Sequence, residues 1–168
     1  MQFLVKNDIM NTYLTKWVIN LTKVMFVCLG NICRSPMAEF LFKDLVKKKG
    51  LENEFYIASA ATSTEAVGSG IHPGTKEILF QHNIKFDKRT AVQFTKNDYE
   101  EFDYIIGMDS SNIRNLLRMT DNDPQGKVYK LLDFCGGGDV KDPWYTGNFT
   151  ETYDDITRGL DSFLNKIK

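Results

Sequence analysis

Two cysteines and an arginine lie in one short segment, residues 27–36, which reads V-C-L-G-N-I-C-R-S-P. Five residues separate Cys28 from Arg34. A loop this short that closes onto the N-terminus of a helix turns several backbone N–H groups inward, and such a nest binds anions. Arg34 adds a planar fork of donors that matches two oxygens of a phosphate. The segment therefore predicts a site for a tetrahedral oxyanion, with the Cys28 sulfur at its floor.

The sulfur of Cys28 is the candidate nucleophile of this loop. A thiol ordinarily has a pKa near ~8.5, and a helix N-terminus beside a cation lowers it by several units. Cys28 is then a thiolate at neutral pH, and the Ser35 hydroxyl can donate to it. Attack on phosphorus by this thiolate gives a cysteinyl-phosphate, which divides one difficult displacement into two. The loop N–H groups and Arg34 would stabilise the equatorial oxygens in the transition state.

The loop itself supplies the phosphate-binding groups. Gly30 and Asn31 are residue types that adopt the left-handed conformation that such a curl requires. The residues expected to bind the phosphate are Leu29, Gly30, Asn31, Ile32, Cys33 and Arg34.

Two other interpretations of the cysteines stay open at this point. A cysteine at the end of a strand is commonly a small buried hydrophobe. Cys28 and Cys33 are separated by four residues, a spacing that zinc sites use, but zinc needs two further ligands. His72 and His82 do not offer a suitable pair, and an arginine inside the loop opposes a cation. We therefore expect no metal.

The segments around the loop alternate apolar runs with amphipathic stretches. Residues 24–27 are a continuous apolar run, as in a strand buried on both faces. Ser35 and Pro36 are typical of an N-cap and a first helical residue, and this helix ends in three lysines and Gly50. Asp109 is expected to cap a later helix. Further strands are predicted at residues 55–59, 84–86, 104–108 and 128–132, and further helices at residues 74–82, 110–117 and 153–167.

Strands that alternate with helices indicate the α/β class. We expect one three-layer domain, with a central parallel sheet of about four strands and helices on both faces, as in flavodoxin-like or Rossmann-like folds. Ligands of such sheets bind outside the carboxyl ends of the strands. The loop after the first strand lies at this edge.

Composition narrows the class of protein. The chain has 168 residues, with 21 basic and 22 acidic side chains. This balance argues against a nucleic-acid footprint and gives no reason to expect binding to a membrane surface. Three cysteines are too few for a disulfide framework and favour a reducing, cytoplasmic setting. Residues 1–22 have no continuous apolar run of the secretion-signal type and are predicted to be an N-terminal appendage, disordered or helical.

The segment C-L-G-N-I-C-R-S-P-M-A-E, residues 28–39, resembles the signature loop of the low-molecular-weight protein tyrosine phosphatases. Further along, Asp142-Pro143-Trp144-Tyr145 resembles the second motif of that family, an Asp-Pro followed by two aromatic residues. The resemblance extends over residues 23–168, which we expect to be the phosphatase domain. It implies hydrolysis of phosphotyrosine in proteins, and of small aryl phosphates, with inorganic phosphate as product and inhibitor and no cofactor.

The resemblance also implies roles for individual residues. A phenolic leaving oxygen has a pKa near ~10, so a proton donor should accelerate its departure by about 10²–10⁴-fold. Among the alternatives as acid, Asp109 is the residue expected to cap a helix. The implied roles are nucleophile for Cys28, phosphate clamp for Arg34, general acid and base for Asp142, loop support for Asn31 and Ser35, and walls of a slot for the phenyl ring for Trp144 and Tyr145.

Cys33 has a possible redox role or a packing role, and both stay open. Two sulfurs at the ends of a tight loop can come within disulfide range, roughly 4.4–6.8 Å between α-carbons. A disulfide between Cys28 and Cys33 would protect an oxidised nucleophile from irreversible oxidation. The resemblance implies the same pairing.

Differences from the family's usual motifs, and alternative functions of similar proteins, bear on which substrate this protein uses. This chain has Trp144 where the family often has tyrosine, and Glu65 in the region where some members place an aromatic residue. Arsenate reductases of similar fold need a further cysteine pair, whereas outside the loop this chain has only Cys135. Protein arginine phosphatases carry threonine at the position of Ile32, whose bulk favours a phenolic ester. The remaining alternatives are a non-catalytic phosphate-binding module and a thiol sensor.

Overall fold

The computed structural model of the chain describes residues 21–168 and is built on a parallel sheet with the strand order β2-β1-β3-β4. The predicted appendage, residues 1–22, lies outside the described residues except for its last two. The strands are β1 (Thr22–Cys28), β2 (Phe55–Ala61), β3 (Tyr104–Gly107) and β4 (Val128–Lys130). The helices are α1 (Arg34–Lys48), α2 (Pro73–Gln81), α3 (Lys96–Glu101), α4 (Ser110–Met119), α5 (Pro143–Thr146) and α6 (Phe149–Ile167), with 3₁₀ turns η1 (Glu52–Glu54) and η2 (Leu131–Cys135).

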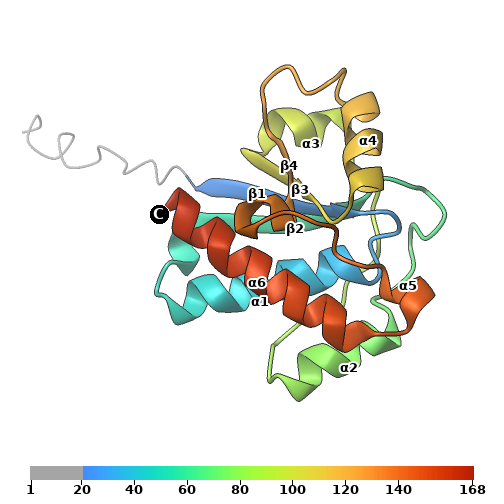
Figure 1. Cartoon of the computed structure of the whole chain (residues 1–168), viewed down its shortest axis with the longest axis vertical. Helices are drawn as coiled ribbons and strands as arrows, with labels where there is room; N and C mark the ends of the chain where they lie inside the picture. Colours follow the sequence, from blue (N-terminus) through green and yellow to red (C-terminus); the bar gives the residue numbers. More distant parts are fainter. Residues whose placement is uncertain (1–20) are drawn as a thin grey trace, which may run out of the picture.

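The predicted three-layer α/β architecture is confirmed. In Figure 1, α3 and α4 lie on one side of the sheet, and α1, α2 and α6 lie on the other. Strand β1 is central and its alternate side chains serve both layers: Phe26 packs beneath α1 and α6, whereas Val27 packs beneath α3 and α4. This two-sided burial is why the strand reads as a continuous apolar run. Within residues 21–168, no helix combines the length and apolar character needed to cross a membrane.

The order of the strands places the site. The chain leaves β1 toward β2 on one side, and β3 then returns to pair with the other side of β1, so the winding reverses between β1 and β3. Loops at the carboxyl ends of two such strands diverge and leave a crevice. The segment after Cys28 and the segment after Gly107 both begin at this crevice.

Three local predictions need correction. Residues 84–86 do not form a strand: the Ile84 N–H donates to the Leu79 carbonyl and closes α2, while the Ile84 side chain enters the core. Helix α1 begins at Arg34, so the predicted cap residue, Ser35, is already inside the helix. Cys33 takes the N-cap position instead. The strand predicted at residues 128–132 ends at Lys130, where η2 begins.

Candidate active site

The loop after β1 curls around the sulfur of Cys28. Cys28 is the last residue of β1 and is buried. Asn31 adopts the left-handed conformation, with φ 55°, and its backbone N–H donates to Cys28 Sγ at 3.2 Å. Gly30 does not adopt a positive φ. Ser35 Oγ lies 3.1 Å from the same sulfur. The sulfur thus accepts the Asn31 N–H and lies within hydrogen-bond distance of the Ser35 hydroxyl.

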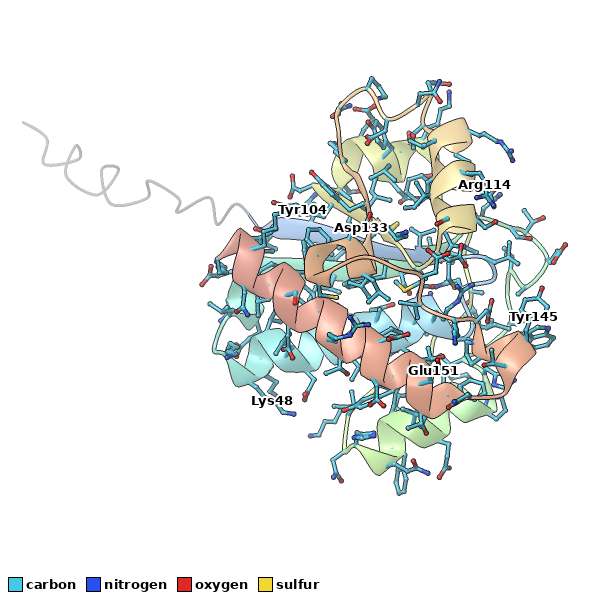
Figure 2. The ribbon with its side chains drawn as sticks, viewed as in Figure 1. Lys48, Tyr104, Arg114, Asp133, Tyr145 and Glu151 are labelled. Carbon is cyan, nitrogen blue, oxygen red and sulfur yellow. The ribbon has the colours of Figure 1, made fainter. Side chains whose placement is uncertain are left out.

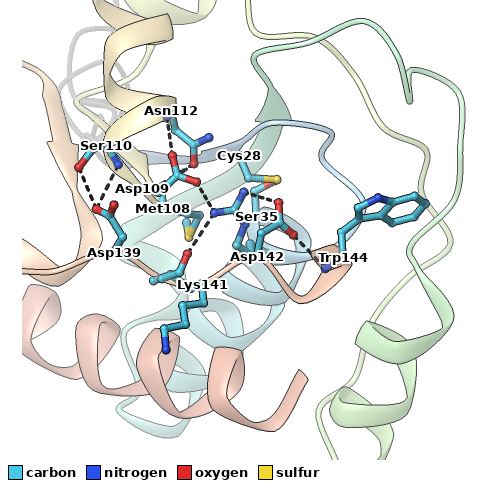
Figure 3. A network of polar contacts seen from close by, with 12 residues as sticks. Cys28, Ser35, Met108, Asp109, Ser110, Asn112, Asp139, Lys141, Asp142 and Trp144 are labelled. Carbon is cyan, nitrogen blue, oxygen red and sulfur yellow. Dashed lines mark hydrogen bonds and ion pairs between the residues drawn. The ribbon is translucent and has the colours of Figure 1, made fainter. Parts of the chain in front are cut away.

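Arg34 is buried and lies between two carboxylates. Its Nη1 donates to Asp109 Oδ2 at 2.5 Å and to the Val140 carbonyl at 3.1 Å, and its Nη2 donates to Asp142 Oδ2 at 2.6 Å. Burial lowers the pKa of Arg34, but the negative charges of Cys28, Asp142 and Asp109 more than offset this, so its pKa is above the ordinary value. The Nε of Arg34 has no hydrogen-bond partner within residues 21–168. Figure 3 shows this network, with Asp109 and Asp142 near Cys28.

The two carboxylates beside Arg34 also begin helices. Asp109 caps α4: its Oδ1 accepts from the Asn112 N–H at 2.7 Å, as predicted for this residue. Asp142 caps α5: its Oδ1 accepts from the Trp144 N–H at 3.1 Å. In each residue one carboxylate oxygen is used by the cap and the other by Arg34. Both side chains are therefore fixed against the guanidinium of Arg34.

The segment before Asp142 is anchored by contacts of two residues, Asp139 and Val140. Val140 is fully buried and its N–H donates to the Met108 carbonyl at the end of β3. Asp139 accepts from the backbone and hydroxyl of Ser110 and pairs with Lys130 at 3.1 Å. Although burial alone would raise it, the pKa of Asp139 is below its ordinary value because of these bonds. Residues 139–142 are therefore held in place by the sheet, although three glycines precede them.

A cavity of about 360 Å³ opens above the loop. It is lined by Cys28, Leu29, Gly30, Ile32, Cys33, Arg34, Glu65, Ala66, Ser69, Asp142, Trp144 and Tyr145. Trp144 is 61% exposed and Tyr145 is 77% exposed, so these two residues form the rim of the cavity and are not core residues. In Figure 2, Tyr145 projects from α5 at the edge of the molecule. Of the predicted site residues, Asn31 and Ser35 lie behind the cavity wall, where they contact Cys28.

Cys33 lies at the end of the loop as a buried free thiol. Burial, together with the negative charges of Cys28 and Asp142, raises its pKa from 9.0 to about 12. The Cys33 carbonyl accepts from the Thr75 hydroxyl at 3.2 Å, which ties the loop to α2. Cys33 is therefore a neutral thiol at physiological pH.

Comparison with known proteins identifies the family to which this fold and site belong. The sequence model described as "Low molecular weight phosphotyrosine protein phosphatase" matches residues 23–168. The chain belongs to this family.

Individual relatives agree with this assignment. YfkJ of Bacillus subtilis (strain 168), named a low molecular weight protein-tyrosine-phosphatase, is 45% identical over 148 residues, which are 86% of this chain and 95% of that protein. The crystal structure of YfkJ matches with a TM-score of 0.83 at 44% identity, over 88% of this chain and 94% of that one. PtpA of Staphylococcus aureus (strain MRSA252) is 40% identical over 146 residues, 86% of this chain and 92% of the relative. A Drosophila arginine phosphatase matches with a TM-score of 0.80 at 32% identity, over 87% and 98% of the two chains.

The structure of this family member also brings in residues that the sequence did not single out. Arg89 donates to Asn31 Oδ1 at 2.5 Å from a loop 58 residues further along the chain, and Ser59 and Glu39 lie beside it. His72 supports the cavity rim: its N–H donates to the Ile32 carbonyl and its ring packs edge-on against Trp144 at 5.8 Å. Glu39 is the last residue of the 28–39 segment, whereas Arg89, Ser59 and His72 lie outside both motifs, so only the folded chain shows that these residues come together.

Proposed function

We propose that this protein hydrolyses phosphotyrosine in proteins, and small aryl phosphates, through a phosphoenzyme on Cys28. The observation that carries the proposal is the position of Cys28 at the base of the cavity, with Arg34 and Asp142 in direct contact beside it. A nucleophile, a cation for phosphoryl oxygens and a carboxylate for proton transfer thus converge from three segments. Membership of the phosphatase family supports the same assignment.

In the first step the Cys28 thiolate attacks phosphorus, an S–P bond forms, and the bond to the phenolic oxygen breaks. Asp142, as the protonated acid, gives its proton to that oxygen, so that the phenol leaves neutral. Phosphoryl oxygens replace Asp142 as partners of the Arg34 fork, and the Nε donor of Arg34 is available to them as well. The backbone N–H groups of the loop stabilise the remaining charge.

In the second step water attacks the phosphorus of the phosphoenzyme. Asp142, now ionised, accepts a proton from this water, the S–P bond breaks, and Cys28 returns to the thiolate. Inorganic phosphate is the product, and it inhibits because it occupies the same loop. Neither step calls for a metal or an organic cofactor.

The cavity favours an aromatic ester. Trp144 and Tyr145 present flat apolar surfaces at its rim, and Ile32 presents an aliphatic side chain at its wall. A phenyl ring between such surfaces places its oxygen next to Asp142 and its phosphorus above Cys28. A guanidinium, as in phosphoarginine, would lose hydration against these groups without gaining a hydroxyl partner from Ile32.

Two further proposals concern the cysteines. Cys33 is the resolving partner of Cys28: once an oxidant converts Cys28 to a sulfenic acid, Cys33 condenses with it to a disulfide and water is released. All three cysteines, in residues 21–168, are free thiols, which supports a reducing, cytoplasmic setting. That residues 1–22 form a disordered or helical appendage to the phosphatase domain, residues 23–168, also stays a prediction.

The experiment is phosphate release from a phosphotyrosine peptide, with phosphoarginine and phosphoserine peptides as controls, for wild type and Cys28→Ser. We expect release from phosphotyrosine alone and none from the variant. Preference for phosphoarginine would overturn the interpretation of Ile32. No release from any peptide would leave the loop as a phosphate-binding or redox module and would overturn the proposal.

A further inference from the structure

A second cavity, also of about 360 Å³, lies at the β4 edge of the sheet. Its walls come from α4, β4, η2 and the end of α6, and none of its residues lines the cavity above Cys28. We call it the β4 cavity, and it is lined by Ser110, Ile113, Arg114, Val128, Tyr129, Lys130, Asp133, Phe134 and Lys166. The steps proposed above make no use of it.

The β4 cavity has an excess of positive charge. Its lining residues include three cations, Arg114, Lys130 and Lys166, and one carboxylate, Asp133. In Figure 2, Arg114 lies on α4 and Asp133 on η2. Asp133 lies 3.6 Å from Lys130 Nζ and its side chain is 61% exposed, so solvent screens its charge. Within residues 21–168, neither Arg114 nor Lys166 forms an ion pair, so both are available to an anionic ligand.

Lys130 is held in place at one side of the cavity. Its Nζ lies 3.1 Å from Asp139 Oδ1 and 3.4 Å from Ser110 Oγ. The hydrogen bond to Asp139 raises the pKa of Lys130 above its ordinary value, so this side chain is charged at neutral pH. Lys130 is therefore a fixed cation, whereas Arg114 and Lys166 are exposed side chains that can adjust to a ligand.

Apolar and aromatic side chains form the rest of the wall. The rings of Tyr129 and Phe134 lie 5.7 Å apart between centroids, at an angle of 40°. Lys166 Nζ lies 5.5 Å from the centroid of the Phe134 ring, which keeps this cation over the apolar wall. Ile113 and Val128 add aliphatic surface. A ligand that fills the cavity thus meets apolar surface and cations together.

This combination favours an aromatic ring that carries a phosphate. Arginine and lysine bind the oxygens of a phosphate, and a partly exposed tyrosine offers a surface on which a ring can stack. The cavity above Cys28, for which we propose a phosphotyrosine side chain as ligand, has the same volume and also combines an arginine with aromatic side chains. In the part of the chain that the structure describes, no cysteine lines the β4 cavity.

The first residues of α4 connect the two sites. Asp109 contacts Arg34, whereas the next residue, Ser110, lines the β4 cavity. Ser110 also donates to Asp139, three residues before Asp142, and Figure 3 shows these four side chains together. A protein bound above Cys28 therefore has the β4 cavity within reach of a further side chain.

We propose that the β4 cavity is a second, non-catalytic binding site for a phosphotyrosine side chain of a substrate protein. Arg114 and Lys166 bind the phosphate, Lys130 adds a fixed charge, and Tyr129 stacks on the ring. Because no nucleophile lines the cavity, the phosphate stays attached. The choice of phosphotyrosine rests on the proposed function, since the proposed substrates carry this side chain.

The test is a titration of the full-length Cys28→Ser variant with N-acetyl-phosphotyrosine amide, followed by NMR of the isotope-labelled protein. Cys28→Ser is used so that the probe is not consumed. The backbone amide signals of Ser110 and Lys130 report on the β4 cavity, and those of residues 29–34 report on the phosphate loop.

Two double variants are compared in this background. Arg114→Met/Lys166→Met removes the two exposed cations of the β4 cavity. The matched control, Lys76→Met/Arg118→Met, removes the same charge at exposed positions that line neither cavity. Because all four side chains are exposed, we expect both variants to fold.

We expect both groups of signals to shift, with a Kd of about 1 mM at the β4 cavity. Arg114→Met/Lys166→Met should weaken binding there by about tenfold or more, the effect of losing hydrogen bonds to a charged group, and change the Kd of the loop less than about twofold. Lys76→Met/Arg118→Met should match its parent. Inorganic phosphate and N-acetyl-tyrosine amide, which each lack one half of the probe, should bind the cavity about tenfold more weakly or worse.

Each outcome decides the proposal. No shift at the β4 cavity with about 10 mM probe would overturn it, and so would an unchanged Kd in Arg114→Met/Lys166→Met. Inorganic phosphate that binds the cavity as tightly as the probe would also overturn it, because the ring would then contribute nothing. If wild type releases no phosphate from any ester, the proposed function fails, and the signals of Ser110 and Lys130 still decide whether the second site exists.

Discussion

Nη1 of Arg34 lies 2.5 Å from Oδ2 of Asp109, and the other oxygen of that carboxylate caps α4. The Asp109 side chain thus connects Arg34, the proposed phosphate clamp, with the start of the helix that follows β3. The Arg34 side chain is 3% exposed and that of Asp109 is 20% exposed, so their pairing is largely shielded from solvent. Substitutions of Asp109 can separate the cap from the charge.

We expect Asp109→Ala to lower the free energy of unfolding by about 1–2 kcal/mol more than Asp109→Asn. Asparagine caps a helix about as well as aspartate, whereas alanine does not. Both variants remove the charge beside Arg34, so their common loss measures the ion pair and their difference measures the cap. Urea denaturation followed by circular dichroism gives both values. Equal losses in the two variants would contradict the capping role.

Substitution of Asp142 can likewise separate its helix cap from its carboxylic acid, and here the effect is measured by kinetics. Asp142→Asn keeps the cap on α5 but carries no transferable proton. We expect kcat for phenyl phosphate to fall by about 10²–10⁴-fold, and for an activated ester with a good leaving group to fall much less in the first step. The measurement is burst kinetics on a series of aryl phosphates with different leaving-group pKa values. Equal losses along the series would argue against Asp142 as the acid.

The raised pKa of Cys33 predicts a pH dependence of stability. The folded-state pKa is about 12 against an ordinary value of 9.0, so the unfolded chain releases this proton first as the pH rises. The contribution of the Cys33 thiol is therefore complete below pH 9 and is lost progressively between pH 9 and about 12.

Cys33→Ala removes this dependence and so provides the comparison. We expect the stability difference between wild type and Cys33→Ala to shrink by about 1.5 kcal/mol between pH 9 and pH 10.5. Urea denaturation of both proteins across this range measures it, and the subtraction cancels the lysines and tyrosines that titrate in both. A difference that stays constant with pH would mean that burial does not suppress ionisation of this thiol.

Tyr145 provides a test of the cavity rim. Its side chain is 77% exposed, so Tyr145→Ala should change the free energy of unfolding by less than about 0.5 kcal/mol. KM for a phosphotyrosine peptide should rise several-fold, because the phenyl ring loses one stacking surface. Steady-state kinetics and thermal unfolding check both statements. The exposed Phe80, on α2, gives a matched control, since Phe80→Ala should leave KM unchanged.

The sequence predicted most of what lies close together along the chain. The apolar run of β1, the tight loop after it and the cap at Asp109 are local features, and each is present in the structure. The strand predicted at residues 84–86 was wrong because one buried residue, Ile84, serves a turn at the end of α2 as well as it would serve a strand.

What the sequence could not predict depends on distant pairs. Ser35 looked like a cap because serine before proline usually is one, but its hydroxyl lies 3.1 Å from Cys28 Sγ and 3.3 Å from the Ala60 carbonyl oxygen. Arg89 could not be identified because its partners, Asn31 and Glu39, lie on other segments, and a single charged residue in a loop is usually solvated. The second role of Asp109, beside Arg34, is of the same kind: a local motif explains the residue and conceals its tertiary contact.

The partners of Arg34 also have a consequence for synthesis. Asp109 and Asp142 follow Arg34 by 75 and 108 residues. A ribosome therefore finishes the loop around Cys28 early and supplies Asp142 only when nearly all of the domain has been translated. With the roles proposed for Cys28 and Asp142, a nascent chain carries the nucleophile before it carries the acid, so we expect no hydrolysis until residue 142 has been translated.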